Sequence, residues 1–529
     1  MSAAPVVRTK AGRVRGAVRA GSRTFAAIPY AAPVTGPARF AGPTPAPRWD
    51  GVRDATVPGR AAPSPRRPDF GGMDLSAVLG PGWGPPSPLP EPGSVPDAGY
   101  LTVTVTGPDD PGGGLPVLVF IHGGGLLSGT GQAALYDGSS FARHGVIVVT
   151  LNYRLGIAGW LDVPGAPANR GLLDVIAALG WVAENAGAFG GDPGKVTVAG
   201  HSAGAMIVAA LLASRDAGTL FTRAISQSGS GTTAITAEQA AVTTRAVAEV
   251  LNLRPTPGEL GAIDDRTLTD ALGRIGPVAV LPGGPRDVSL GNSPFRCVID
   301  GQILEDQPAI AVRDGRGADV DLLIGTNREE ANLYTVPSGA DVTMTEAQLL
   351  ALTVRRFTDP RERLAAYRAN EPTCSPGRLA GRLITDAFTH GSRLLTDAHA
   401  HAHAHAHHQR ARTFAYEFAW RSAAFTGRLG ACHCVELPFV FHRTDIPSLY
   451  GDTALLGPGR PPGGLADRVH GAWLNFIRHG DPGWTPYDTS TRTAALIDEQ
   501  WSTVSLPALD EDIGTASGRH RAADDLRSG

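Results

Sequence analysis

The chain has 529 residues, of which 42% are hydrophobic and 18% charged, and its formal net charge is -3. This composition is typical of a soluble globular protein with a sizeable core. The charge excludes a strongly basic surface, so we expect neither nucleic acid nor a membrane as a partner. Four cysteines in this length exclude a disulfide-rich scaffold.

Residues 5–30 alternate in the manner of strands, whereas residues 31–95 are rich in Pro and Gly and predict an irregular insertion. The N-terminus has no apolar stretch that resembles a signal sequence. No run of about 18 apolar residues, the length needed to cross a membrane, occurs in the chain. We therefore expect a cytoplasmic protein, although a secreted protein read without its leader would look the same.

Short apolar runs predict strands at residues 100–105, 115–121, 146–151, 196–200, 224–228, 320–325 and 413–420. Helical spacing covers residues 172–185, 235–275, 345–400 and 466–479. This alternation predicts the α/β class, a mostly parallel sheet with helices on both faces. We find no repeat and no clear linker, so we expect a single domain over residues 1–529, with insertions at about 31–95, 235–300 and 340–410.

The most informative stretch is residues 196–205, Val-Thr-Val-Ala-Gly-His-Ser-Ala-Gly-Ala. It combines a buried strand, a G-x-S-x-G turn centred on Ser202, and the start of an apolar helix. Such a turn lifts the serine hydroxyl above the sheet and directs the helix N-terminus at it. The pattern predicts Ser202 as a nucleophile, against the alternative of an ordinary N-cap serine.

A serine nucleophile needs N–H donors that stabilise negative charge on the substrate oxygen. Residues 121–126, Ile-His-Gly-Gly-Gly-Leu, follow a predicted strand and leave backbone N–H groups uncovered, which is typical of an oxyanion loop. A flexible turn is the alternative. A phosphate loop is excluded because no Gly-Lys-Ser/Thr follows. The N–H of Ala203, directly after the nucleophile, is expected to contribute a further donor.

The acid and the base remain ambiguous from the residues alone. Glu329 and Glu330 both follow the strand at 320–325, and either has a suitable position for the acid. Several histidines lie later in the chain and could act as the base: His390, His433, His442, His470, His479 and His520. Among these, His433 lies in a Gly-containing loop that enters an apolar run, a suitable position for a base.

Two further features could suggest metal binding. Residues 399–408 form an Ala-His tract, and alternate histidines share one face of an extended chain. A repeat expansion in a surface loop at the end of a helix is the simpler interpretation. Cys432 and Cys434 flank His433, but a Cys-His-Cys site would lack enough nearby ligands, so we predict free thiols. We expect no metal and no cofactor.

Taken together, the sequence resembles the type B carboxylesterases, the family of cholinesterases and bacterial para-nitrobenzyl esterases. The similarity extends over nearly the full length. The segments that carry it include residues 25–31, 115–126, 152–156, 169–174, 181–185, 189–193, the turn at 200–204, 325–330, 436–439 and 480–482.

The resemblance implies an α/β-hydrolase fold and a serine carboxylesterase that acts through an acyl-enzyme with a Ser-Glu-His triad. It maps the acid to Glu330, the last residue of the Gly-Thr-Asn motif, and the base to His433, which precedes Glu-Leu-Pro-Phe. It maps the oxyanion donors to Gly124, Gly125 and Ala203. A lipase, thioesterase or amidase on the same fold is the alternative, and a non-catalytic cholinesterase-like interaction protein is a more remote one.

The sequence departs from the family pattern beside the nucleophile, where His201 replaces the usual Glu. We expect His201 to modify the charge around His433 without replacing it. The two cysteines of the family's N-terminal disulfide fall at Ala62 and Ala98, which agrees with a reducing compartment. We expect a monomer that acts on a small-molecule ester, with acyl and alcohol pockets lined from residues 63–95 and 277–296.

Overall fold

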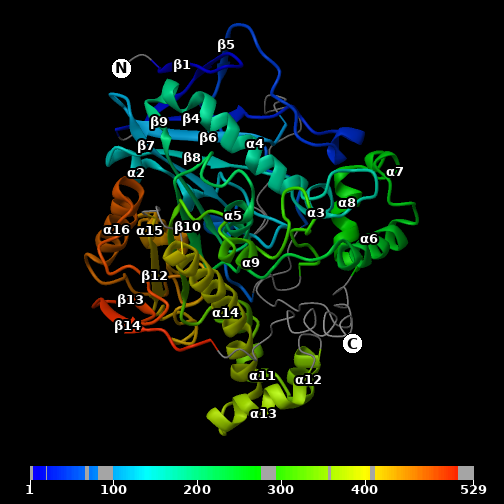
Figure 1. Ribbon diagram of the computed structural model, residues 1–529, viewed down its shortest axis with the longest axis vertical. Helices are drawn as coiled ribbons and strands as arrows, with labels where there is room; N and C mark the ends of the chain where they lie inside the picture. The colour runs from blue at the N-terminus through cyan, green and yellow to red at the C-terminus, as the bar shows by residue number, and fades with distance from the viewer. Residues whose placement is uncertain are drawn as a thin grey trace.

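The computed structural model describes residues 4–19, 21–65, 71–80, 99–275, 293–354, 359–405 and 411–509. Within these ranges a sheet of eleven strands forms the centre of the molecule (Figure 1). Its spatial order is β14 (Ser502–Ser505), β13 (Thr493–Ile497), β12 (Thr413–Phe418), β11 (Asp321–Asn327), β10 (Arg223–Gln227), β9 (Gly191–His201), β7 (Leu115–Ile121), β8 (Ile147–Leu151), β6 (Thr102–Pro108), β4 (Ser22–Pro29) and β3 (Ala17–Arg19). A smaller sheet holds β1 (Val6–Arg8), β2 (Arg13–Arg15) and β5 (Val52–Asp54).

The seven strands from β8 to β13 pair in parallel, and antiparallel strands complete both ends of the sheet. Side chains alternate between the two faces, as the two-residue period of a strand requires. In β7, Val117 and Val119 join one hydrophobic core, and Leu118 and Phe120 join the other. The predicted mostly parallel sheet, buried on both sides, is therefore confirmed.

Different helices cover the two faces. One core includes residues of α4 (Arg170–Asn185) and α5 (Ala203–Ala213). The other core includes residues of α2 (Ser139–Arg143), α15 (Leu437–Val440) and α16 (Leu465–His479). The stretch Arg170–Phe189 is long and apolar enough to cross a membrane, but 56% of its apolar window is buried inside the protein. It therefore has the character of a core helix.

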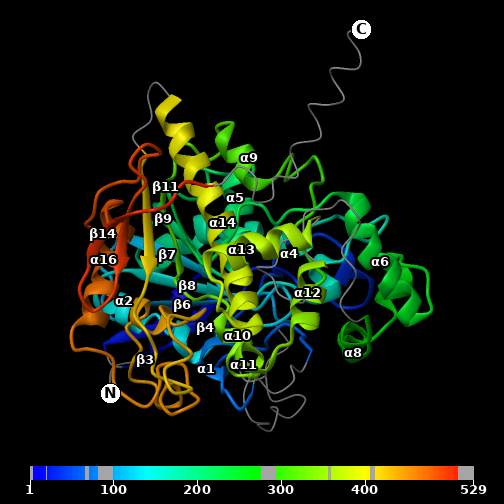
Figure 2. The same ribbon diagram turned by 90° about the horizontal axis from the view of Figure 1, so that it is seen from below.

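A helical group projects from the carboxyl edge of the sheet. The long helix α14 (Pro376–His405) begins beside α11 (Ala340–Thr343), close to α12 (Glu346–Val354) and α13 (Pro360–Asn370), and then packs along β11 (Figure 1). Seen from below, this group lies in front of the sheet (Figure 2). The remaining helices are α1 (Ser76–Leu79), α3 (Gly156–Trp160), α6 (Ala237–Leu251), α7 (Pro257–Gly261), α8 (Asp265–Ile275), α9 (Pro308–Arg313) and α10 (Asn332–Thr335), and the short 3-10 helices are η1 (Gly36–Phe40), η3 (Ala134–Tyr136), η4 (Ala186–Phe189) and η5 (Pro447–Leu449).

The Ala-His tract differs from expectation. Our prediction of a surface loop is wrong for residues 399–405, because α14 continues to His405. Alanine is the best helix former, which favours this continuation. His399 is buried, and its Nδ1 lies 2.7 Å from Thr413 Oγ1 on β12. Alternate residues of a helix do not share one face, so the helical part does not present the histidine row of an extended chain. Residues 406–408 lie outside the described ranges.

A buried ion pair fixes α4 against the loop that follows β8. Arg154 and Asp174 are both fully buried, and the Arg154 side chain donates to both carboxylate oxygens, at 2.8 and 2.6 Å. Its Nη1 donates to the carbonyls of Arg39 and Ala41 at 3.0 and 2.5 Å. This pair ties three segments that are distant in sequence into one rigid unit.

Candidate active site

Ser202 lies at the turn between β9 and α5, with a φ of +57° that only a strongly constrained L-residue adopts. The flanking glycines are required by close contacts. A Cβ at Gly200 would lie 2.3 Å from the Gly204 carbonyl oxygen, and a Cβ at Gly204 would lie 2.1 Å from the Ile121 oxygen. The Ser202 N–H donates to the Gln227 carbonyl of β10 at 2.9 Å. The G-x-S-x-G pattern thus reflects the tight packing of α5 against the end of β7.

The glycine loop after β7 lies directly against Ser202. A Cβ at Gly123 would be 3.0 Å from the Ser202 Cβ. Gly124 and Gly125 have φ values of +118° and +66°, which favour glycine. Across the described residues, the backbone N–H groups of Gly124, Gly125 and Ala203 donate to no protein acceptor. These three donors are therefore available to a substrate oxygen at the N-terminus of α5.

The base of this loop is held rigidly. The buried His122 ring stacks on Tyr153 with centroids 4.5 Å apart, and its Nδ1 lies 2.8 Å from the Gly123 carbonyl oxygen. Burial lowers the pKa of His122 to about 4, so the ring is neutral at physiological pH. The Tyr153 hydroxyl donates to the His122 carbonyl at 2.9 Å. The loop is positioned before a substrate arrives, as electrostatic stabilisation of an oxyanion requires.

Glu330 and His433 form a buried pair at the carboxyl end of β11. Glu330 Oε2 lies 2.5 Å from His433 Nδ1, and Glu330 Oε1 accepts from the Asn327 N–H at 2.7 Å. Both side chains are at most 2% exposed. His433 Nε2 is also buried and makes no hydrogen bond within the described part of the chain. The carboxylate thus orients the imidazole and leaves Nε2 as its only available ring nitrogen.

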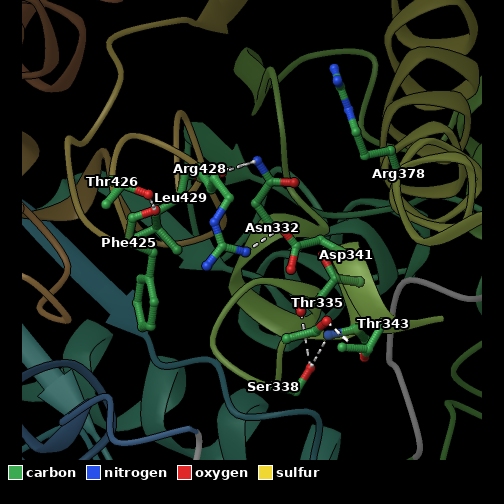
Figure 3. Close-up of polar contacts among 12 residues, drawn as sticks. Asn332, Thr335, Ser338, Asp341, Thr343, Arg378, Phe425, Thr426, Arg428 and Leu429 are labelled. Carbon is green, nitrogen blue, oxygen red and sulfur yellow. Dashed lines mark hydrogen bonds and ion pairs between the residues drawn. The ribbon is translucent and has the colours of Figure 1, made fainter. Parts of the chain in front are cut away.

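Glu329 faces away from this pair. Its carboxylate pairs with Arg421 and accepts from the Ala431 N–H at 2.9 Å. It lines a cavity of about 710 Å³ bounded by α10, α11, α14 and the loop at 421–428. Figure 3 shows part of this region, where Arg428 pairs with Asp341. The two glutamates, which the residues alone left open and the family resemblance distinguished, therefore face different environments.

His201 lies beside both His433 and Glu436. Its ring centroid is 4.5 Å from that of His433, and its Nε2 is 3.5 Å from Glu436 Oε1. Among the described groups, neither of its ring nitrogens has a hydrogen-bond partner. Burial, and secondarily the charge of His433, lower the pKa of His201 well below its ordinary value. Its contact with Glu436 is therefore that of a neutral ring rather than an ion pair.

Glu436 is a buried residue whose position near His201 the sequence did not reveal. Its carboxylate accepts from Asn327 Nδ2 at 2.6 Å and from Gln227 Nε2 at 3.2 Å. Burial raises the pKa of Glu436 to about 7, and the Asn327 hydrogen bond opposes that rise. Asn327 therefore donates to two carboxylates, from its backbone N–H to Glu330 and from its side chain to Glu436. Its position just after the predicted strand at 320–325 is the one sequence signal that could have indicated this role.

The other candidate histidines lie in different surroundings. His470 Nδ1 is 2.8 Å from the Val440 carbonyl oxygen, and His442 pairs with Asp467 at 2.7 Å. His479 is exposed at the end of α16. His520, Ala98 and most of the expected pocket-lining segments 63–95 and 277–296 lie outside the described residues. None of the four cysteines forms a disulfide.

These features define a serine hydrolase with the α/β-hydrolase fold. The family model of the carboxylesterases matches residues 3–510. The chain is 34% identical to the para-nitrobenzyl esterase of Bacillus subtilis (strain 168), over 94% of this chain and 95% of that protein. It is 32% identical to the phenmedipham hydrolase of Pseudarthrobacter oxydans, over 90% of both chains. The protein belongs to the carboxylesterase family and is a carboxylic ester hydrolase.

Solved structures agree with this assignment. A para-nitrobenzyl esterase superposes with a TM-score of 0.78 at 31% identity, covering 96% of this chain and 100% of that one. A carboxylesterase from Geobacillus stearothermophilus superposes with a TM-score of 0.76 at 32% identity, covering 98% and 99% of the two chains.

Proposed function

We propose that Ser202 is the nucleophile of this esterase, with His433 as its general base and Glu330 as the orienting acid. His433 Nε2 takes the hydroxyl proton as Ser202 attacks the ester carbonyl, and Glu330 stabilises the imidazolium that forms. The imidazolium then protonates the leaving alcohol. Water, activated by the same imidazole, releases the acid from the acyl-enzyme.

The observation that carries this assignment is the buried 2.5 Å contact between His433 Nδ1 and Glu330. It fixes the tautomer that leaves Nε2 as an acceptor. No hydrogen bond joins Ser202 Oγ to His433 Nε2 in the described residues. Catalytic hydrogen bonds in ligand-free enzymes are often long and tighten only when substrate binds. The N–H groups of Gly124, Gly125 and Ala203 are proposed to hold the oxyanion.

The proposed substrates are small carboxylic esters, including para-nitrobenzyl esters like those named for the Bacillus relative. A panel of para-nitrophenyl and para-nitrobenzyl esters of increasing acyl length, with matched thioesters and anilides, tests this proposal. We expect the highest kcat/KM with short acyl esters. A preference for long-chain esters, thioesters or anilides would instead identify a lipase, a thioesterase or an amidase.

We also propose that the protein is a cytoplasmic monomer. Support for a reducing compartment comes from its four free cysteines. Size-exclusion chromatography with light scattering should give the mass of one chain. A dimer mass would overturn the monomer proposal.

A further inference from the structure

A cluster of potential metal ligands surrounds the imidazole of His433. His201, His433 and Cys434 each offer one ligand atom, and these atoms all lie within 4.8 Å of one another. His201 is the last residue of β9, His433 and Cys434 lie in the loop before α15, and all three are buried. We propose that these three residues bind a divalent transition metal such as Zn²⁺, and that the bound metal inhibits the esterase.

Three of the four histidine nitrogens in this cluster have no hydrogen-bond partner in the described structure. His433 Nε2 and both ring nitrogens of His201 are buried without hydrogen bonds in the described structure. Leaving such atoms unsatisfied costs free energy, and a metal would satisfy them.

The surroundings of the cluster resemble the outer shell of a metal site. Glu330 holds His433 Nδ1, and this carboxylate–histidine arrangement commonly orients a metal-binding imidazole. Glu436 lies 3.5 Å from His201 Nε2. In the described residues no arginine or lysine bonds to either carboxylate. Two buried carboxyl groups that lack an arginine or lysine partner favour a cation at the two histidines.

Cys434 supplies the soft ligand. Its φ of +75° is uncommon for a residue with a side chain, so the surrounding structure holds this loop position firmly. Binding would form a Zn–S bond and release the thiol proton to solvent. Zinc needs ligand bonds of about 2.0–2.3 Å, so the three side chains must close slightly around the ion. A water molecule or Ser202 Oγ would complete the tetrahedron.

Inhibition follows from the atom that the metal occupies. His433 Nε2 is the nitrogen proposed to accept the Ser202 proton, so a metal bound there removes the base. The activity part of the test rests on the proposed function, whereas metal binding itself does not. Zn²⁺ should therefore abolish ester hydrolysis in the wild-type enzyme, and EDTA should restore it. Mg²⁺ and Ca²⁺, which prefer oxygen ligands, should have no effect.

The variant Cys434→Ser should raise the Zn²⁺ concentration for half-inhibition by about tenfold or more, relative to the metal-free rate of the same variant. Cys432→Ser is the matched control, because Cys432 is equally buried and its thiol faces the His433 carbonyl oxygen at 3.4 Å. Its zinc sensitivity should equal that of wild type. His201→Gln provides a second ligand variant and should also weaken inhibition.

Co²⁺ gives a readout that does not depend on activity. The wild-type protein should show a thiolate-to-cobalt charge-transfer absorption at one equivalent, and Cys434→Ser should lack it. Replacing His403, His405, His407 and His408 by alanine tests whether cobalt binds the Ala-His tract instead. This variant should retain the charge-transfer absorption.

Equal zinc sensitivity of the Cys432→Ser and Cys434→Ser variants, or a cobalt spectrum without thiolate absorption in wild type, would overturn the metal site. A cobalt–thiolate signal in a protein that hydrolyses no ester would instead reject the proposed function and leave the metal site intact.

Discussion

Arg154 with Asp174 and His433 with Glu330 are both fully buried pairs of ionisable groups, but their remaining polar atoms differ. Besides Asp174, the Arg154 guanidinium donates to backbone carbonyls, those of Arg39 and Ala41. Around His433, by contrast, three imidazole nitrogens of two adjacent rings have no hydrogen bond in the described structure. The Arg154 guanidinium is thus hydrogen-bonded on all sides by the protein, whereas the rings at His433 and His201 keep nitrogens that can bond to a substrate or ligand.

Under the proposed function, this difference separates a structural from a catalytic use of buried charge. A satisfied network stabilises one packed arrangement, and an unsatisfied one costs stability that enzymes accept at their sites. Substitutions in the two regions should therefore affect different measurements: unfolding for the Arg154 pair and turnover for the His433 pair.

The largest expected effect is on turnover. Glu330→Gln should lower kcat by about 10⁴-fold, because the amide can no longer stabilise the imidazolium or fix its tautomer. Steady-state hydrolysis of a para-nitrophenyl ester measures the loss, and the urea midpoint should stay close to wild type. Glu329→Gln is the matched control, since Glu329 faces Arg421 instead. If Glu329→Gln proved the more damaging change, the assignment of the acid would be wrong.

The next effect is on stability. Asp174→Ala should lower the free energy of unfolding by about 3–5 kcal/mol, because it leaves Arg154 buried without its counter-ion. Equilibrium urea unfolding measures this change. Asp192→Ala removes the partner of Lys195 in an exposed pair and should have no measurable effect. A catalytic defect in natively folded Asp174→Ala, with no loss of stability, would contradict the comparison.

The smallest effect is a shift in pH dependence. His201→Glu places a carboxylate beside the His433 imidazole, where the two rings are now 4.5 Å apart, and a nearby negative charge favours the protonated ring. Because the base must be neutral, the acidic limb of kcat/KM should move to higher pH. A move of this limb by about one pH unit would lower the rate about tenfold at each pH on the limb.

The matched control is His201→Gln, which keeps the position neutral and should leave that limb in place. EDTA in the assay removes inhibitory metal. A limb that stays fixed in His201→Glu would show that residue 201 does not influence the charge at His433.

The predictable parts of the molecule were those with local signals. The buried strand at 115–121 and the turn around Ser202 carry their structure in consecutive residues, and the structure agrees with both. β14 was missed because its short run, Ser502–Ser505, is largely exposed and has no buried alternation. The helical part of the Ala-His tract differs from our prediction because we interpreted the repeat as a loop expansion and gave too little weight to the helix propensity of alanine.

The site was less predictable because its contacts are long-range. Glu329 and Glu330 are adjacent in sequence, and only the arrangement of the loop at 429–434 decides which of them meets His433. Asn327 binds Glu436 across 109 positions. The approach of His201 to Cys434 likewise depends on how β9 and the loop before α15 pack. A pattern of neighbouring residues does not predict contacts between residues so far apart in the sequence.

Covalent labelling of the nucleophile tests the central claim most directly. A fluorophosphonate forms a stable adduct with an activated serine, and mass spectrometry of peptides locates the modified residue. We expect one adduct per chain, on Ser202, with complete loss of esterase activity, and no adduct in the Ser202→Ala variant, which should also be inactive. Labelling of another residue, or hydrolysis that continues unchanged in Ser202→Ala, would contradict the account.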